Sequence, residues 1–301
     1  MRWCRAILYD LMPAMSRPFK TIAVIGKYMN PEIRDQILQL AGFLAQQNLG
    51  VLIEEQTAEQ SNIEGYATVN IEAIGSNADL AVVVGGDGTM LSVARSLVEH
   101  DVPLVGINRG RFGFLTDLSA DSMLPSMETI LAGNYTTEER ILLCAEIIRF
   151  GEEIYCGRAM NDVVVNKSGV ARLIELEVYI DGQFVYRQRS DGLILATPTG
   201  TTAYSLSAGG PILHPTLDAI AMVPICPHTL SNRPIAINSA SQVEITLIHA
   251  AEARVHFDGQ MQVPLQEGDT IRVERSEKTI TLLHPAGHSH YGMLRDKLHW
   301  G

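Results

Sequence analysis

The chain has 301 residues, enough for two ordinary domains, and its 46% hydrophobic residues allow each domain to bury a core. Its 23 lysines and arginines and 34 aspartates and glutamates give a net charge of −11, which argues against a protein that holds nucleic acid through a basic surface. No apolar stretch reaches the roughly 20 residues needed to cross a bilayer. We therefore expect a globular protein that binds neither nucleic acid nor membranes.

The first 16 residues precede any regular pattern. Asp10 interrupts their apolar part, so they do not indicate a signal peptide, and we expect residues 1–16 to be a disordered extension. The chain has four cysteines: Cys4, Cys144, Cys156 and Cys226. None forms a CxxC pair or a metal-ligand spacing, which favours a reducing compartment, and we expect a cytoplasmic protein.

The first half of the chain alternates strand and helix patterns. The segment "KTIAVIGK" (20–27) predicts a buried strand, and Asn30 and Pro31 predict the start of a helix. Similar patterns follow at 51–55, 78–100 and 102–108. Strands that are apolar throughout are typical of a parallel sheet with helices on both faces. We therefore expect a Rossmann-like α/β domain over residues 17–140.

A glycine-rich turn follows one of these strands, in "VVVGGDGTML" (82–91). Such a turn lies at the carboxyl edge of the sheet, where open α/β sheets bind ligands. Glycines let the backbone approach a ligand, and the helix start offers N–H groups to an anion, so we expect a phosphate site. Its members would be Gly85, Gly86, Gly88 and Thr89. The turn matches neither GxGxxG, because Leu91 replaces the last glycine, nor the Walker loop.

Asp87 lies inside this turn and has two interpretations. A carboxylate here can cap the helix in an ordinary tight turn. It can also serve phosphoryl transfer to an alcohol, which needs an acceptor for the hydroxyl proton and a metal ion on the donor phosphates.

From about residue 141 the pattern changes to an alternation of apolar and polar residues. It is clearest at 173–188 and 253–285, where Asp-Gly pairs at 181–182 and 258–259 predict hairpin turns. We therefore expect a mostly β domain over residues 141–285.

Between these strands lies "TPTGTTAYSLSAGGPILHP" (197–215), which predicts a binding loop that leads into a short helix. Its hydroxyls and amides can bind ribose and phosphate without a permanent positive charge. A capped helix that places Tyr204 and Leu206 in the core explains the same residues.

Six segments in this order resemble the bacterial NAD kinases: "GGDGTML" (85–91), "GINRGRFGFLTD" (106–117), "NDVVVNK" (161–167), "SDGLILATPTGTTAYSLSAGGPIL" (190–213), "PICPHTLSNRPI" (224–235) and "FDGQ" (257–260). The resemblance implies transfer of the γ-phosphoryl group of ATP to the 2'-hydroxyl of the adenosine ribose of NAD, which makes NADP. It also implies an α/β domain joined to a C-terminal β-sandwich, an active site between them, and a tail (286–301) that returns to the first domain. The family implies a homodimer or homotetramer.

The resemblance also assigns roles to single residues. Asp87 would be the general base, Gly88 would open the backbone beside it, and Asn161 and Asp162 would contact the adenine and ribose of NAD. Asp162 stands where the family has the longer glutamate. Further NAD contacts would be Arg172, Arg189, Asp191, Thr202, Ala203, Tyr204, Ser205, Leu206, Ser207 and Gln260. A divalent cation, Mg²⁺ or Mn²⁺, would be held mainly by ATP, with Asp87 as a candidate ligand.

Three histidines crowd the C-terminus without a partner cysteine or an HExxH helix. We expect His284, His288 and His290 on a surface strand or loop, and no structural metal. Arg109 and Arg111, on a glycine-rich loop, can approach the ATP phosphates or stay solvated.

Three other functions compete with the NAD kinase hypothesis. A lipid kinase of the diacylglycerol kinase type, or a phosphofructokinase, carries a related GGDG turn but lacks the segment at 197–210. A non-catalytic protein that senses NAD or NADP would keep the pocket without turnover.

Overall fold

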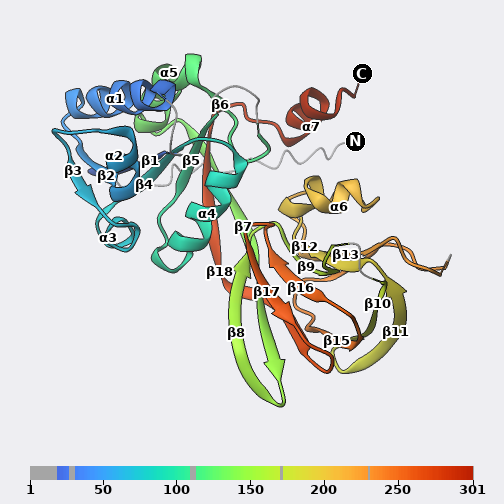
Figure 1. Ribbon diagram of the computed structural model, residues 1–301. Coiled ribbons are helices and arrows are strands. Elements are labelled where there is room, and N and C mark those ends of the chain that lie inside the picture. Colours follow the sequence, from blue (N-terminus) through green and yellow to red (C-terminus); the bar gives the residue numbers. More distant parts are fainter. Residues whose placement is uncertain (1–18, 27–30, 109–112, 170–171, 230, 301) are drawn as a thin grey trace, which may run out of the picture.

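The computed structural model describes residues 19–26, 31–108, 113–169, 172–229 and 231–300 (Figure 1). The predicted extension 1–16 lies outside these residues, as do Asn30, Arg109 and Arg111. Within them, no helix has the length and apolar character that a membrane crossing requires.

The N-terminal half is a parallel sheet with helices on both faces, as predicted (Figure 1). Its strands, in spatial order, are β3 (Ala67–Val69), β2 (Gly50–Glu54), β1 (Thr21–Gly26), β4 (Leu80–Val84) and β5 (Leu104–Asn108), with the short β6 (Leu118–Ser119) beside β5. Its helices are α1 (Pro31–Gln46), α2 (Glu55–Ser61), α3 (Ile71–Asn77), α4 (Asp87–Leu97) and α5 (Met123–Leu131). The apolar faces of α1 and α5 pack on one side of the sheet, and those of α3 and α4 pack on the other.

The C-terminal half consists of two antiparallel sheets packed face to face. The sheet of the N-terminal half continues through β18 (Thr270–Pro285), β15 (Val243–His249), β10 (Ile174–Ile180), β11 (Gln183–Ser190), β7 (Tyr135–Arg149) and β8 (Glu152–Ala159). The second sheet contains β14 (Ile235–Asn238), β13 (Ala219–Ile225), β12 (Gly192–Ala196), β9 (Asp162–Lys167), β16 (Ala253–Phe257) and β17 (Met261–Leu265). Alternate side chains of both sheets form one apolar core, so this half is a β-sandwich.

Both predicted hairpins are present. Asp181 and Gly182 join β10 to β11, and Asp258 and Gly259 join β16 to β17. All four residues have positive φ, between 51° and 74°. That left-handed geometry is what an Asp-Gly hairpin turn uses.

Two long strands run through both halves. β18 pairs with β15 in the sandwich and, at Leu282 opposite Leu104, with β5 of the α/β half. β7 pairs with β18 over most of its length, and the boundary predicted at residue 140 falls inside β7. The sheet of the α/β half and one of the two sheets of the sandwich are therefore a single hydrogen-bonded sheet.

Short helices complete the chain. A 3-10 turn, η3 (Thr199–Thr202), and α6 (Tyr204–Ser207) follow β12, where the sequence predicts a binding loop and a short helix. After β18 the chain ends in α7 (His290–Leu298), which lines a cavity together with Gly113, Asp117 and Leu118 of the α/β half.

Candidate active site

Asp87 begins α4, and Gly85 and Gly86 separate it from the buried strand β4. Its carboxylate accepts hydrogen bonds from a loop that is distant in the sequence. Oδ2 accepts a hydrogen bond from the backbone N of Phe114 at 2.7 Å, and Oδ1 accepts from the backbone N of Leu115 at 3.1 Å. Oδ1 also accepts from the N and Oγ1 of Thr116, at 3.2 and 3.0 Å. The N-cap of α4 is Gly86, so Asp87 does not cap its own helix.

The absence of a side chain at Gly113 lets this loop approach the Asp87 carboxylate. A Cβ at this position would overlap the Asp87 carboxylate and crowd Thr116 Oγ1, so a larger residue would displace one of them. Gly113 and Thr116 were not among the predicted site residues. Their only signal was the segment "GRFGFLTD", which belongs to the family resemblance.

The predicted phosphate loop offers an open backbone. Gly86 is exposed and extended, with φ −105°, and a Cβ there would meet no atom within 4 Å. Thr89 Oγ1 is buried and has no hydrogen-bond partner among the described residues. An unpaired buried hydroxyl at a helix start is suited to a phosphate oxygen.

We expect Gly86→Ala to raise the KM for ATP, the donor that the family resemblance implies, at least tenfold while changing the stability of the fold by no more than about 1 kcal/mol. The new methyl group meets no protein atom, so a loss of ATP affinity would report a ligand against this backbone. Steady-state kinetics and thermal unfolding check both parts. An unchanged KM at an unchanged Tm would remove Gly86 from the phosphate site.

Four of the predicted NAD contacts line one cavity of about 320 Å³: Asn161, Asp162, Ala203 and Tyr204. The other lining residues are Val164, Asn166, His256, Asp258 and Gly259. Asn161 and η3 approach closely because Gly200 has no side chain, since a Cβ there would overlap the Asn161 backbone. The Asn161 carbonyl also accepts a hydrogen bond from Thr197 N at 2.9 Å.

Several predicted contacts do not line this cavity. Arg172 and Arg189 are exposed, and Asp191 forms an ion pair with Lys167 at 2.7 Å. In the loop segment, Thr202 Oγ1 donates to the Thr199 carbonyl at 3.1 Å, and Ser205 is buried. Leu206 is half-buried and Ser207 is exposed, and neither of them lines this cavity. Their NAD roles stay predictions.

Asp258, which the sequence predicts only as a hairpin-turn residue, also connects the cavity to the α/β half. Its fully buried carboxylate accepts hydrogen bonds from the backbone N of Met160, Asn161 and Asp162, at 3.1, 2.7 and 3.2 Å. It also forms an ion pair with Arg95 of α4. One carboxylate therefore orients the start of β9 and ties it to the α/β half.

Gln260 makes a second link between the two halves. Its Nε2 donates to the Gly88 carbonyl at 2.7 Å, and its Oε1 accepts from Arg95. The predicted contact Gln260 therefore lies against the glycine-rich turn. Through these links the turn that carries Asp87 is held beside the cavity that contains Asp162.

Asp162 has an unusual acidity. Burial, together with the negative charge of Asp258, raises the pKa of its carboxyl to about 7. Arg95 forms an ion pair with Asp258 and so offsets part of that negative charge. Burial lowers the pKa of the His256 imidazole, which lines the same cavity. The ionised form of the Asp162 carboxyl, which can act only as a hydrogen-bond acceptor, therefore prevails only above about pH 7.

We expect Asp162→Asn to stabilise the unliganded fold at alkaline pH. The wild-type carboxyl has a pKa of about 7 when folded against 3.8 ordinarily, so the folded state binds the proton more tightly and loses stability as the pH rises between these values. Asparagine removes this loss, which we expect to be on the order of 2 kcal/mol at about pH 8 and negligible at about pH 4. Thermal unfolding across this range checks it. A difference between the proteins that does not vary with pH would contradict the raised pKa.

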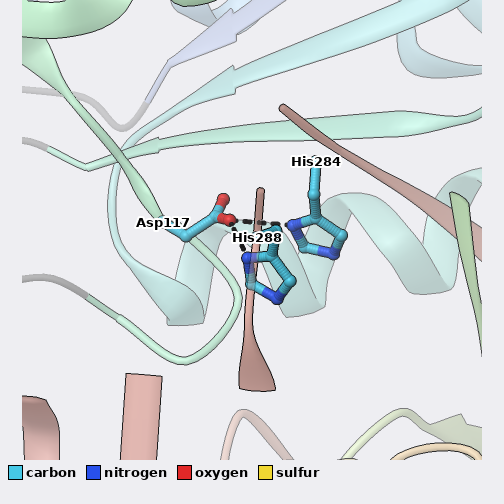
Figure 2. Close-up of side chains that lie close together, drawn as sticks. All are labelled: Asp117, His284 and His288. Carbon is cyan, nitrogen blue, oxygen red and sulfur yellow. Dashed lines mark hydrogen bonds and ion pairs between the residues drawn. The ribbon is translucent and has the colours of Figure 1, made fainter. Parts of the chain in front are cut away.

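The C-terminal histidines are not on the surface, contrary to the prediction. The side chains of His284 and His290 are buried, with 2% and 8% of their surface exposed. Figure 2 shows His284 and His288 turned toward Asp117, and each Nδ1 lies 2.8 Å from Asp117 Oδ2. The sequence pattern missed this because Asp117 precedes His284 by 167 residues.

The tail also brings a positive charge to the active site. Burial lowers the pKa of the Lys297 ammonium, whereas the negative charges of Asp87 and Asp296 raise it. Lys297 of α7 is thus close enough to Asp87 for their charges to interact. Lys297 was not among the predicted site residues.

Comparisons with known proteins agree with this geometry. Residues 22–135 match the model of the ATP-NAD kinase N-terminal domain, and residues 160–284 match that of the ATP-NAD kinase C-terminal domain. The NAD kinase of Aromatoleum aromaticum is 53% identical over 289 residues, 96% of each chain. That of Thiobacillus denitrificans is 53% identical over 287 residues, 95% of this chain and 99% of the relative.

Solved structures give the same result. Yeast NADH kinase, crystallised with NADH, superimposes with a TM-score of 0.85 at 25% identity, covering 95% of this chain and 89% of the other. An NAD kinase from Archaeoglobus fulgidus in complex with ATP superimposes with a TM-score of 0.73 at 26% identity, covering 93% and 98%. Since two family models cover most of the chain and close relatives cover nearly all of it, this chain belongs to the ATP-NAD kinase family.

Proposed function

We propose that this chain phosphorylates NAD with Asp87 as the proton acceptor and the cavity around Asp162 as the site of the adenosine half. Family membership makes the chain an NAD kinase that forms NADP. The observation that carries the proposal is the pair of links, Arg95 to Asp258 and Gln260 to Gly88, that hold the Asp87 turn beside this cavity.

The reaction requires one bond to form and one to break. The 2'-oxygen of the adenosine ribose attacks the γ-phosphorus of ATP, the bond from that phosphorus to the β,γ-bridging oxygen breaks, and ADP leaves. The hydroxyl proton passes to Asp87. Among the residues that the structure describes, Oδ2 accepts one hydrogen bond, from Phe114 N, which leaves a second lone pair on this oxygen for the proton. The bonds from residues 114–116 orient the carboxylate.

The cavity walls support binding of a nucleoside. Tyr204 is 43% exposed and offers an aromatic face on which a base can stack. The ionised Asp162 can accept hydrogen bonds from ribose hydroxyls, and Asn161 offers both a donor and an acceptor. The remaining predicted contacts, including Arg172, Arg189 and Asp191, would serve the part of NAD beyond this cavity.

The residues present fit a divalent cation that arrives with ATP. The Asp87 oxygen that we propose as proton acceptor is also a donor of the kind that Mg²⁺ prefers, although it can serve only one of these two roles at a time, and the ATP phosphates would supply most of the ligands. When bound, the ion would offset the negative charge of the phosphates.

A coupled assay tests the proposed function. Purified protein with ATP and Mg²⁺ should convert NAD to NADP, and the assay should be run in parallel with NADH and with diacylglycerol as acceptors. Phosphorylation of diacylglycerol alone would support a lipid kinase instead. Binding of NAD without turnover would support a non-catalytic sensor.

We propose in addition a cytoplasmic homodimer or homotetramer, as the family resemblance and the cysteine usage suggest. Light scattering coupled to size exclusion measures the number of subunits, and a monomer would contradict this part of the proposal.

A further inference from the structure

Three side chains from distant segments converge beside the C-terminal helix, and we call them the tail cluster: Asp117, His284 and His288 (Figure 2). Asp117 directly precedes β6, His284 lies near the end of β18, and His288 lies in the loop before α7. The turn after β18 uses Gly287 at φ 93°, and it returns His288 over His284. The two rings stack with their centroids 3.9 Å apart.

We propose that the tail cluster is a binding site for a divalent transition-metal ion, with Zn²⁺ as the best match. One ligand atom from each of the three residues lies within 4.8 Å of the others, and both Nδ1 atoms lie 2.8 Å from Asp117 Oδ2. Two imidazoles and one carboxylate form a common three-ligand set for zinc, and the fourth position is left for water or another ligand.

Binding of such an ion requires the three side chains to rearrange locally. On a tetrahedral zinc ion with bonds of about 2.1 Å, neighbouring ligand atoms lie about 3.4 Å apart. Asp117 Oδ2 is 2.8 Å from each Nδ1, so the carboxylate would move outward by roughly half an ångström. One of the two stacked imidazoles would also rotate out of the stack, because an ion lies close to the plane of each ring that binds it. It borders the cavity lined by Gly113, His288 and Lys297, which gives it room to move and gives an ion a route to the site.

The surroundings also favour a cation at the Nδ1 atoms. A histidine that binds a metal through Nδ1 carries a proton on Nε2, which commonly faces a carboxylate. His284 Nε2 lies 3.6 Å from Glu138 Oε2, in the place of such a partner. A carboxylate therefore lies on each side of this imidazole. The Nε2 atoms of both histidines are buried and have no hydrogen-bond partner within the described part of the chain.

The cluster would hold the tail against the active-site loop. Asp117 follows Thr116, which hydrogen-bonds to Asp87, and His288 leads into α7. An ion here would therefore connect the loop that orients Asp87 to the helix that carries Lys297. This role differs from that of the magnesium ion carried by ATP, which prefers oxygen ligands.

The cysteines are the competing transition-metal ligands. Cys144 and Cys156 lie on neighbouring strands with their Sγ atoms 3.5 Å apart. Burial and the neighbouring Cys156 raise the pKa of the Cys144 thiol to about 12, so it stays protonated at neutral pH and is a poor ligand. A cobalt complex distinguishes the two sites, because thiolate ligands add an intense ultraviolet absorption that nitrogen and oxygen ligands lack.

The test is a titration of the full chain, free of any affinity tag and treated with chelator, with ZnCl₂ and CoCl₂. We expect one ion per chain, visible cobalt absorption without a thiolate band, and a rise in Tm of roughly 5 °C at zinc concentrations about 100-fold above the Kd. His288→Ala should weaken binding at least tenfold. Cys156→Ser and His249→Ala, the latter an exposed histidine paired with Glu267, should leave it unchanged.

The proposal fails if the wild-type chain binds no stoichiometric zinc, if Cys156→Ser abolishes binding, or if His288→Ala binds as tightly as the wild type. Should His288→Ala not fold, Asp117→Asn replaces it, with the same expected loss. Binding and Tm are measured without substrates, so failure here and failure of the proposed kinase reaction are distinguishable.

Discussion

Replacement of Asp87 by asparagine is expected to lower kcat by about 10²- to 10⁴-fold, the range that a positioned proton acceptor contributes. Asparagine has nearly the same shape but cannot take the 2'-hydroxyl proton. We expect the Kd of NAD to change little, because asparagine keeps the shape of the side chain and the cavity around Asp162 keeps its own lining residues. Steady-state kinetics together with NAD binding by calorimetry measure both quantities.

The structure shows that this variant needs a control. The Asp87 carboxylate accepts four hydrogen bonds from residues 114–116, so asparagine would also set an amide NH₂ against one of these donors. Thr116→Val removes one of the four bonds and keeps the carboxylate. We expect it to destabilise the fold by about 1–2 kcal/mol but to lower kcat less than tenfold. If both variants lost the same activity, Asp87 would be a residue that orients the loop and not the base.

Replacement of Asp258 by alanine should have the largest effect on stability, a loss of about 3–5 kcal/mol. The change leaves the Arg95 guanidinium without its buried partner, and it leaves three backbone N–H groups at the start of β9 without an acceptor. We also expect weaker NAD binding, because those N–H groups position Asn161 and Asp162. Urea unfolding and calorimetry measure the two effects.

Gln260→Ala is the matched comparison for Asp258→Ala. Gln260 is exposed and also bridges the two halves, through Arg95 and the Gly88 carbonyl. Its loss should cost about 1 kcal/mol or less. Arg95→Ala should be much less harmful in an Asp258→Ala background than alone, since the pair acts as a unit. Additive effects of the two changes would show that the ion pair is not the source of stability.

The elements of the fold could be predicted where local pattern determines them. The strand Leu80–Val84 is apolar throughout because helices cover both faces of its sheet, and that pattern is visible without the structure. The Asp-Gly hairpins were equally predictable, because Asp258 and Gly259 tolerate the positive φ that the turn requires.

The site was predictable only in part, because its main contacts join residues far apart in the chain. Asp258 is identifiable as a turn residue, but its bond to Arg95 spans 163 positions and leaves no local signal. The prediction that the C-terminal histidines lie on the surface was wrong for the same reason. A histidine among polar residues near a C-terminus is ordinarily exposed, and only the folded chain brings His284 against Asp117.

The strands β7 and β18 determine how the molecule can move. Two domains joined by a flexible linker can swing open around a ligand, whereas here the backbone ladder of β18 runs from β15 through to β5. Separation of the two halves would break hydrogen bonds between β18 and its neighbouring strands. The cost of breaking these bonds opposes hinge bending of one half against the other. Substrates must then enter through rearrangement of side chains and loops, and heat should melt both halves in a single cooperative transition.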